Sequence, residues 1–333
     1  MSLPSFLRPV SHPSCYGSDA VQHIIGGHFL FQVRFENLIR TRVVYDRRRF
    51  TSLQIVGGHR PPLQSYTEFM ADLDYKGYLK LDELLSLQRP LANPANHDET
   101  LFIIVHQVFE LWFRLILHEI DKIQELLDHD DVLESERLIR RLTSIVRLFI
   151  PKLSVLETMI PSDFVQFRDL LKPASGFQSS QFREIEFASG LKDRRYLGMF
   201  RNDSQATARL EARLAQPTIW DRFIALLKRG GYRVDDEAAQ TQAIIQIYRR
   251  GGDHALRSLC EAMIEYDEMF SLWREHHVRM AQRMIGSKAG TGQAVVESMY
   301  GKAGPMGSMG VEYLSQTLTK KFFPLLWTAR TGM

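Results

Sequence analysis

The feature that most constrains the fold is a stretch of ring-bearing side chains near residue 105. Phe102, His106, Phe109 and Phe113 follow one another at steps of four, three and four residues. Side chains at this spacing share one face of an α-helix, so the stretch predicts a long helix over residues 97–127 with one apolar face. A histidine on that face is either a packed core residue or a functional group, and the stretch alone favours the core residue.

Helical spacing continues through most of the chain after residue 66. A helix is expected to begin at Tyr75 and to cover residues 75–85. Further helices are predicted over residues 132–159, 218–228, 237–249 and 255–285. Pro151 is expected to kink the helix over residues 132–159. Residues 322–327 are expected to end a last helix or strand. Because helices do not alternate with strands, a parallel sheet is excluded and the predicted fold class is all-α.

Residues 1–65 differ from the rest of the chain. They contain eight arginines and no lysine, and short β-leaning pieces at 29–35, 42–45 and 52–56 are separated by glycine and proline pairs. We therefore predict two parts: residues 1–65, an irregular or poorly ordered N-terminal extension, and residues 66–333, an all-α domain. An arm that packs on a neighbouring subunit is the alternative interpretation of residues 1–65.

Composition excludes several classes of protein. The net charge of +3 gives no reason to expect binding to nucleic acid or to an anionic membrane. No run of 18 or more apolar residues occurs, so no membrane-spanning helix is expected. Cys15 and Cys260 are too few for a disulfide framework or a Cys-x-x-Cys zinc site. A cytoplasmic protein is therefore expected.

A second informative histidine lies in the predicted helix over residues 255–285. His277 shares one apolar face with Phe270, Trp273, Met280 and Met284, whereas His276 shares a half-wet face with Leu272, Arg279 and Arg283. His277 is therefore expected to point inward and His276 toward solvent or a charged neighbour. One histidine on each of two apolar helix faces is suited to a haem pocket. Spacing alone leaves packed core histidines as the commoner explanation.

Other chemistries find less support. A di-iron carboxylate bundle needs Glu-x-x-His pairs, and none of the eleven histidines has a glutamate three positions before it. The chain also lacks a Gly-x-Ser-x-Gly hydrolase motif and a P-loop. Asp98 and Glu99, beside His97, are explained by a helix start. Glu110 and Arg114 are expected to pair on the wet side of that helix.

Arg183 follows two aromatic residues and a run of small polar ones. Such an arginine can make a bidentate pair with a carboxylate of a ligand. An ordinary ion pair with Glu184 or Glu186 is the alternative, and the residues alone favour it.

Four segments together resemble the tryptophan 2,3-dioxygenase family. They are YxGxLxLD at residues 75–82, HDExLFIIxHQxxELW at 97–112, SGFQSxQFR at 175–183, and HV at 277–278 followed by RMIGSKAGTG at 283–292. The likeness runs in order from about Tyr75 to the C-terminus. The resemblance implies an all-α haem b protein that forms a homotetramer, built as a dimer of dimers. It also implies insertion of O2 across the C2–C3 bond of the indole of L-tryptophan to give N-formylkynurenine.

The same resemblance assigns roles to seven residues. His277 would be the proximal ligand of the haem iron, and His106 would lie on the distal side near the indole N–H. The substrate-binding residues would be Phe102 in the indole pocket, Arg183 at the carboxylate, Thr291 at the amino-acid head group, and Tyr75 and Tyr78, which would reach into the active site of a neighbouring subunit.

The chain departs from the family pattern after Thr291. The family has a short, Gly-rich loop there, whereas residues 293–309 form a longer insert that is rich in methionine and glycine. Such a loop is expected to close over the substrate and exclude water. The insert leaves open an alternative function, a haem oxygenase of the same fold that acts on a substituted indole or another aromatic amino acid.

Overall fold

The structure is a computed structural model that describes residues 74–249, 251–288, 290–291 and 311–333. The chain divides into two units, residues 1–74 and 75–333, and the helices described below belong to the second. The described residues contain α-helices and short 3₁₀ turns and no strand, so the predicted all-α fold is confirmed. The predicted extension over residues 1–65, with its β-leaning pieces, lies outside the described residues.

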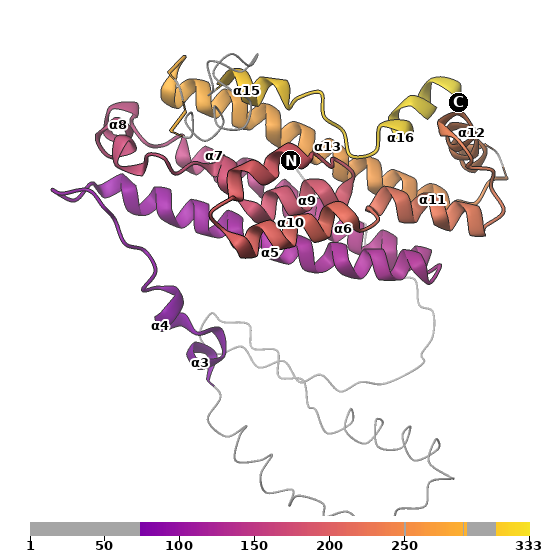
Figure 1. Ribbon diagram of the computed structural model, residues 1–333, viewed down its shortest axis with the longest axis horizontal. Helices are drawn as coiled ribbons and strands as arrows, with labels where there is room; N and C mark the ends of the chain where they lie inside the picture. The colour runs from indigo at the N-terminus through magenta and orange to yellow at the C-terminus, as the bar shows by residue number, and fades with distance from the viewer. Residues whose placement is uncertain (1–73, 250, 289, 292–310) are drawn as a thin grey trace, which may run out of the picture. The chain divides into compact units, whose positions relative to one another are not determined.

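Two helices of 32 residues form the length of the bundle: α5 (His97–Asp128) and α13 (His254–Ile285) (Figure 1). Each begins at a side-chain cap. Asn96 accepts a hydrogen bond from the backbone N–H of Asp98, and Asp253 accepts one from the N–H of Leu256. The predicted helix over residues 97–127 is therefore confirmed to within a residue. The true cap is Asn96, whereas the buried Glu99 carboxylate accepts hydrogen bonds from the backbone N–H groups of Leu91 and Ala92.

The predicted kinked helix over residues 132–159 is two helices, α6 (Val132–Arg147) and α7 (Phe149–Leu156). The break falls at Leu148, before Pro151 rather than at it. Proline has no N–H, and its ring clashes with the carbonyl four residues earlier, which belongs to Arg147. The helix therefore ends at Arg147, and Pro151 lies in the first turn of the next helix, where proline is tolerated.

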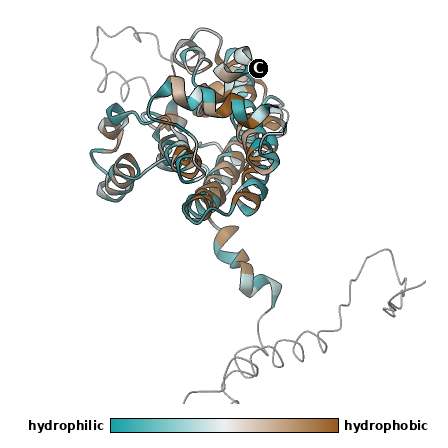
Figure 2. Cartoon of the chain, turned by 90° about the vertical axis from the view of Figure 1, so that its right-hand side faces the viewer, coloured by the Kyte–Doolittle hydropathy of each residue, from teal (hydrophilic) through white to brown (hydrophobic). Residues whose placement is uncertain are grey.

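Helix α6 packs against both α5 and α13. Side chains of α5 and α6 are fully buried in the core, such as Ile116 and Ile120 of α5 and Leu142 of α6. Figure 2 shows the mixture of hydrophobic and hydrophilic segments along the bundle helices, as expected for helices with one apolar face.

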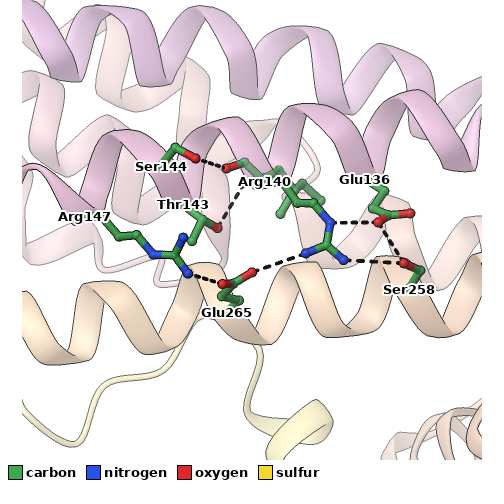
Figure 3. Close-up of polar contacts among 8 residues, drawn as sticks. Glu136, Arg140, Thr143, Ser144, Arg147, Ser258 and Glu265 are labelled. Carbon is green, nitrogen blue, oxygen red and sulfur yellow. Dashed lines mark hydrogen bonds and ion pairs between the residues drawn. The ribbon is translucent and has the colours of Figure 1, made fainter. Parts of the chain in front are cut away.

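A polar network joins the outer sides of α6 and α13 (Figure 3). Ser258 of α13 donates a hydrogen bond to Glu136 at 2.7 Å, and Arg140 lies 2.8 Å from Glu136 and 3.4 Å from Glu265. Arg147 also pairs with Glu265. This network fixes α13, the helix that carries His277, against α6.

The remaining helices surround this core. They are α8 (Pro161–Arg168), α9 (Ser180–Ser189), α10 (Ser204–Ala215), α11 (Ile219–Arg229), α12 (Glu237–Tyr248), α15 (Val311–Gln316) and α16 (Pro324–Ala329). The helices predicted over residues 218–228, 237–249 and 255–285 agree with α11, α12 and α13 to within a residue. Helix α9 packs on α5, and α10 packs on α9.

The single helix predicted over residues 75–85 is wrong. Two short helices occur, α3 (Tyr75–Leu79) and α4 (Leu81–Leu84), separated by Lys80 in the left-handed conformation with a φ of 53°. A helix cannot continue through that conformation, and Gly77 weakens the first of the two.

The C-terminal segment is anchored by one buried carboxylate. Asp267 of α13 accepts hydrogen bonds from the backbone N–H of Phe322 at 2.9 Å, the N–H of Phe323 at 3.1 Å and the indole N–H of Trp327 at 2.9 Å. Residues 322–327 were expected to end a last helix or strand, and the structure has a helix there, α16.

Helix α5 is long and apolar enough to cross a membrane on length and composition alone. A core helix of a helical bundle has the same composition, and α5 packs against α6, α9 and α11. Its inward face carries buried polar side chains, Glu119 and Gln124, beside its apolar ones.

Candidate functional site

A cavity lies among α5, α7, α8, α9 and α13. Its atom-free space is about 1340 Å³, including the part that is open to solvent. Four of the predicted site residues line it: His106, Arg183, His277 and Thr291. These residues are far apart in the chain: His106 lies on α5, Arg183 on α9 and His277 on α13, and Thr291 follows α13.

Three predicted site residues do not line this cavity. Phe102 lies one helical turn before His106, and the two rings are in contact, with their centroids 4.1 Å apart and their planes inclined by 35°. Tyr75 and Tyr78 lie on α3, where they are 75% and 71% exposed. Within this chain, therefore, neither tyrosine contributes to the cavity wall.

The hydrogen bond of His106 fixes which of its ring nitrogens is available. Its Nδ1 lies 2.7 Å from the carbonyl oxygen of Phe102. A carbonyl only accepts, so we assign the proton to Nδ1, which leaves Nε2 as an acceptor. Burial lowers the pKa of His106 and outweighs the opposing effects of this hydrogen bond and of Glu110. The ring is therefore neutral at pH 7.

His277 lies in the cavity wall on α13. Its ring stacks on the indole of Trp273, with centroids 5.5 Å apart and planes inclined by 21°. Burial, together with the nearby His106, lowers the pKa of His277 to about 4. The ring is enclosed by protein yet keeps some accessible surface, because it borders the cavity. His277 is thus a neutral imidazole at pH 7.

The neighbouring His276 points elsewhere. Its Nε2 lies 3.5 Å from a carboxylate oxygen of Glu157, and it does not line the cavity. The helical spacing had predicted this division between His277 inward and His276 toward a charged neighbour.

The cavity has the features that a haem requires. A porphyrin supplies four nitrogen ligands to its iron, so one neutral imidazole from the protein is sufficient. Apolar side chains line the same cavity as His277, among them Phe109, Leu153, Trp273 and Ile285. The indole N–H of Trp273 is buried and has no hydrogen-bond partner within the described part of the chain, so a donor is available at this wall. No group of three or more His, Cys, Asp or Glu side chains is placed to hold a metal ion among the described residues.

Arg183 belongs to a buried ion-pair cluster at the cavity. Its Nη1 lies 2.5 Å from Glu186, and its guanidinium lies 4.0 Å from the ring centre of Tyr196. The other oxygen of Glu186 lies 3.5 Å from Arg274. The alternative that the sequence left open, an ion pair with Glu186, is therefore present, and Arg183 still lines the cavity.

Two further charged residues of the cavity wall were not predicted. Arg168, at the end of α8, is only 9% exposed and lines the cavity. Its one sequence signal is Phe164 four residues earlier, a spacing that puts both on one helix face. Glu110 was expected to pair with Arg114 on the wet side of α5. Instead it lines the cavity and accepts a hydrogen bond from Gln181 at 2.8 Å, because α9 packs against that side of α5.

Gly290 and Thr291, which follow α13, line part of the cavity. Thr291 donates a hydrogen bond from its hydroxyl to the carbonyl of Ala174 at 2.8 Å. Gly290, Thr291, Ser175 and Gly176 all line the cavity. The predicted insert over residues 293–309 lies outside the described residues.

Comparison with known proteins gives a consistent picture. The sequence model of the tryptophan 2,3-dioxygenase family matches residues 64–218 and 204–333. A tryptophan 2,3-dioxygenase of Nocardioides sp. is 41% identical over 275 residues, which is 81% of this chain and 98% of the relative. The enzyme of the same name from Herpetosiphon aurantiacus is 41% identical over 78% of this chain and 98% of the relative.

A third relative, the tryptophan 2,3-dioxygenase of Xanthomonas oryzae pv. oryzae, is 37% identical over 282 residues, or 80% of this chain and 90% of the relative. The matched part contains every described helix and all seven predicted site residues. The chain therefore belongs to the tryptophan 2,3-dioxygenase family.

Proposed function

We propose that this protein is a haem-dependent dioxygenase that inserts O2 across the indole C2–C3 bond of L-tryptophan and yields N-formylkynurenine. The observation that carries the proposal is one aromatic-walled cavity that brings together two neutral histidines from different helices. Haem, when bound, would supply the iron at which dioxygen reacts. A substituted indole as the substrate remains the alternative, and the names of the relatives do not favour it.

His277 would hold the haem iron. Iron binds a neutral imidazole. Because the pKa of His277 is low, its ring is already neutral at pH 7 and need not release a proton when iron binds. Stacking on Trp273 limits the rotation of the ring, so the ligand is oriented before haem binds. No other histidine lines the cavity in the described chain except His106.

His106 would position the indole. With its proton on Nδ1, its Nε2 can accept a hydrogen bond from the indole N–H of the substrate. Indole N–H is a very weak acid, so this contact would orient the ring rather than remove its proton. Phe102 would support His106 through the contact between the two rings.

The substrate head group needs a cation and a hydroxyl. We propose Thr291 for the head group, since its hydroxyl oxygen can still accept a hydrogen bond from an ammonium group. For the carboxylate, the sequence named Arg183, and the cavity offers Arg168 as a second candidate. Both guanidinium groups border the cavity, and Arg183 also pairs with Glu186 at 2.5 Å.

We also propose a cytoplasmic homotetramer in which Tyr75 and Tyr78 pack on a neighbouring copy. Both tyrosines are exposed, and so are Leu85 and Leu91 in the segment that follows, at 71% and 65%. Apolar side chains at such exposure are commonly covered by a partner. Sedimentation velocity on the full chain tests this proposal. The wild type should sediment as a tetramer, and Tyr75→Ser and Tyr78→Ser should weaken the assembly. A wild-type protein that sediments as a monomer would contradict the proposal.

The test of function is an absorption spectrum followed by an assay. The haem-loaded protein should show a Soret band, and adding L-tryptophan to the ferrous protein in the presence of oxygen should produce N-formylkynurenine. His277→Ala should lose stable haem binding, whereas His276→Ala is the matched control that should keep it. A fully haem-loaded protein that does not turn over L-tryptophan, or that prefers a substituted indole, would contradict the proposal.

The two arginines are separated by kinetics. Replacing the true carboxylate partner with glutamine should raise KM for L-tryptophan by about 10- to 100-fold, because a charge-assisted pair is lost. The same change should matter little for L-tryptophan amide, which has no carboxylate. The outcome decides between Arg168→Gln and Arg183→Gln, and no effect in either would refute a guanidinium clamp.

A further inference from the structure

The segment before α5 is tied to that helix by a buried carboxylate. Glu99 is 1% exposed, and its two oxygens accept hydrogen bonds from the backbone N–H of Leu91 at 2.6 Å and from that of Ala92 at 2.9 Å. Hydrogen bonds to a charged acceptor are stronger than those between neutral groups. The helix start already has its cap in Asn96. Glu99 therefore holds the preceding segment rather than capping the helix.

Gln107 holds the same segment about two helical turns further along α5. Its Oε1 accepts a hydrogen bond from Gln88 Nε2 at 2.6 Å, and its own Nε2 donates to the carbonyl oxygen of Leu87 at 3.3 Å. The rise of an α-helix puts Glu99 and Gln107 about 12 Å apart along the axis. The segment is therefore held at two separate points. We call Glu99 and Gln107 the latch, and residues 75–92 the arm.

The helix start from which the arm leaves is itself held. Asn96 donates hydrogen bonds from Nδ2 to the carbonyl oxygen of Asp163 at 3.3 Å and to Gln166 at 3.2 Å. Both residues belong to α8, whose last residue, Arg168, lines the cavity. Helix α5 carries His106 in the same cavity. The base of the arm is thus fixed relative to two walls of the cavity.

The latch holds the backbone of the arm and leaves its apolar side chains in solvent. Leu85, Leu87 and Leu91 are all more than half exposed, although the backbone of Leu87 and that of Leu91 are hydrogen-bonded to α5. Every residue of α3 and α4 is at least partly exposed, and Tyr75 and Tyr78 are the most exposed of their large apolar ones. A segment with a held backbone and exposed apolar side chains is ordered before it binds a partner.

We propose that Glu99 and Gln107 hold the arm in the direction in which it binds a second copy of this chain. The inference rests on the proposed function, in which Tyr75 and Tyr78 pack on a neighbouring copy. It adds the residues that set this contact from within the chain. A loose arm has to be ordered at each association, which weakens the assembly although every contact between the copies can still form.

Breaking the latch should therefore weaken the assembly without changing its size. In Glu99→Gln the charge is lost, and the amide NH2 faces one of the two backbone N–H donors. The dissociation constant of the assembly should rise about 10- to 100-fold. Raising the protein concentration should restore an assembly that sediments as the wild type does. Gln88→Ala and Gln107→Ala should each act in the same direction, and the double variant should be less than additive, since both changes remove one shared hydrogen bond.

The chain offers a matched control on the same helix. Glu119 lies toward the opposite end of α5 from the arm, is 5% exposed and accepts a hydrogen bond from Arg141 at 2.8 Å. Glu119→Gln thus also removes a buried carboxylate from α5. It should lower the thermal stability and leave the dissociation constant of the assembly at the wild-type value.

Two measurements on the full chain test the proposal. Sedimentation velocity over a range of protein concentrations gives the dissociation constant of each variant. Hydrogen exchange, followed by mass spectrometry of the peptide that contains Leu91 and Ala92, reports whether the arm is held. It is measured in a Tyr75→Ser/Tyr78→Ser background, so that a neighbouring copy does not protect these amides. They should exchange slowly there, and faster when Glu99→Gln is added, with no change in peptides from the rest of α5.

A higher dissociation constant in Glu99→Gln, together with faster exchange of the two amides, supports the proposal. A dissociation constant equal to that of Glu119→Gln, or unchanged exchange, overturns it. If Glu99→Gln does not fold, Gln88→Ala and Gln107→Ala decide by the same criteria. A wild-type chain that is monomeric at every concentration contradicts the proposed assembly, and with it the second copy as the partner of the arm. Slow exchange of the two amides in that monomer would separate this failure from a failure of the latch.

Discussion

The low pKa of His277 has a consequence for the stability of the haem-free protein. In the unfolded chain the imidazole has a pKa of 6.5, whereas in the folded protein burial and the nearby His106 lower it to about 4. Between these values the unfolded chain binds a proton that the folded protein does not. Stability from this group is therefore complete above pH 6.5 and is lost as the pH falls toward 4.

The size of the effect follows from the two pKa values. Between pH 7 and pH 5 the unfolding free energy should fall by about 2 kcal/mol because of His277 alone. This is an upper value, because the ring borders a cavity that is open to solvent and water there screens the charge. A glutamine at this position does not titrate, so His277→Gln should lack this part of the acid destabilisation.

Urea unfolding of the haem-free protein at pH 7, 6 and 5 measures the difference directly. Titrating groups that do not act on His277 contribute equally to the wild type and to His277→Gln, so they cancel in the comparison. His106 is the exception, because it lies close enough to lower the pKa of His277. His276→Gln is the matched control. Since His276 faces Glu157 rather than the cavity, its replacement should leave the loss due to His277 in place. If wild type and His277→Gln lose the same stability on acidification, the imidazole of His277 is not buried as described.

Three further predictions concern the fold. Asp267→Asn should lower the unfolding free energy by about 2–4 kcal/mol in urea titrations, because the NH2 group of the new amide must face one of three N–H donors, among them that of Trp327. Trp327→Phe removes a single donor, so a smaller loss in Asp267→Asn than in Trp327→Phe would contradict this prediction. Gly190→Ala should lower the unfolding free energy by about 1–3 kcal/mol or more in the same measurement. Gly190 has a φ of 148°, and an added Cβ would lie 2.6 Å from the carbonyl oxygen of Phe322. Unchanged stability would refute this close approach. Burial raises the pKa of the Cys260 thiol, so Cys260 should resist alkylation at pH 8 in the native protein and react in urea. Peptide mapping after alkylation measures this, and rapid labelling of Cys260 in the native protein would disprove its burial.

Much of the fold could be predicted because helix periodicity is a local property. The phase of the apolar positions in α5 and α13 gave both helices to within a residue and separated His277 from His276. Local rules also explain the failures. One helix with a kink at Pro151 was predicted over residues 132–159, but the clash of Pro151 with the carbonyl of Arg147 ends α6 at Arg147. The family assignment made from four motifs is confirmed by the match over most of the chain.

Spacing along each helix was enough to predict the all-α class and the two histidines on apolar helix faces, whatever the other helices do. The family came from the resemblance of four motifs. Which charged groups meet at the cavity became clear only from the packing of the helices. Arg168 reaches the wall, Glu110 binds Gln181, and Arg183 pairs with Glu186 while Arg274 approaches from another helix. The partner of a long charged side chain depends on which helix packs beside it, and that packing joins residues that are far apart in the chain.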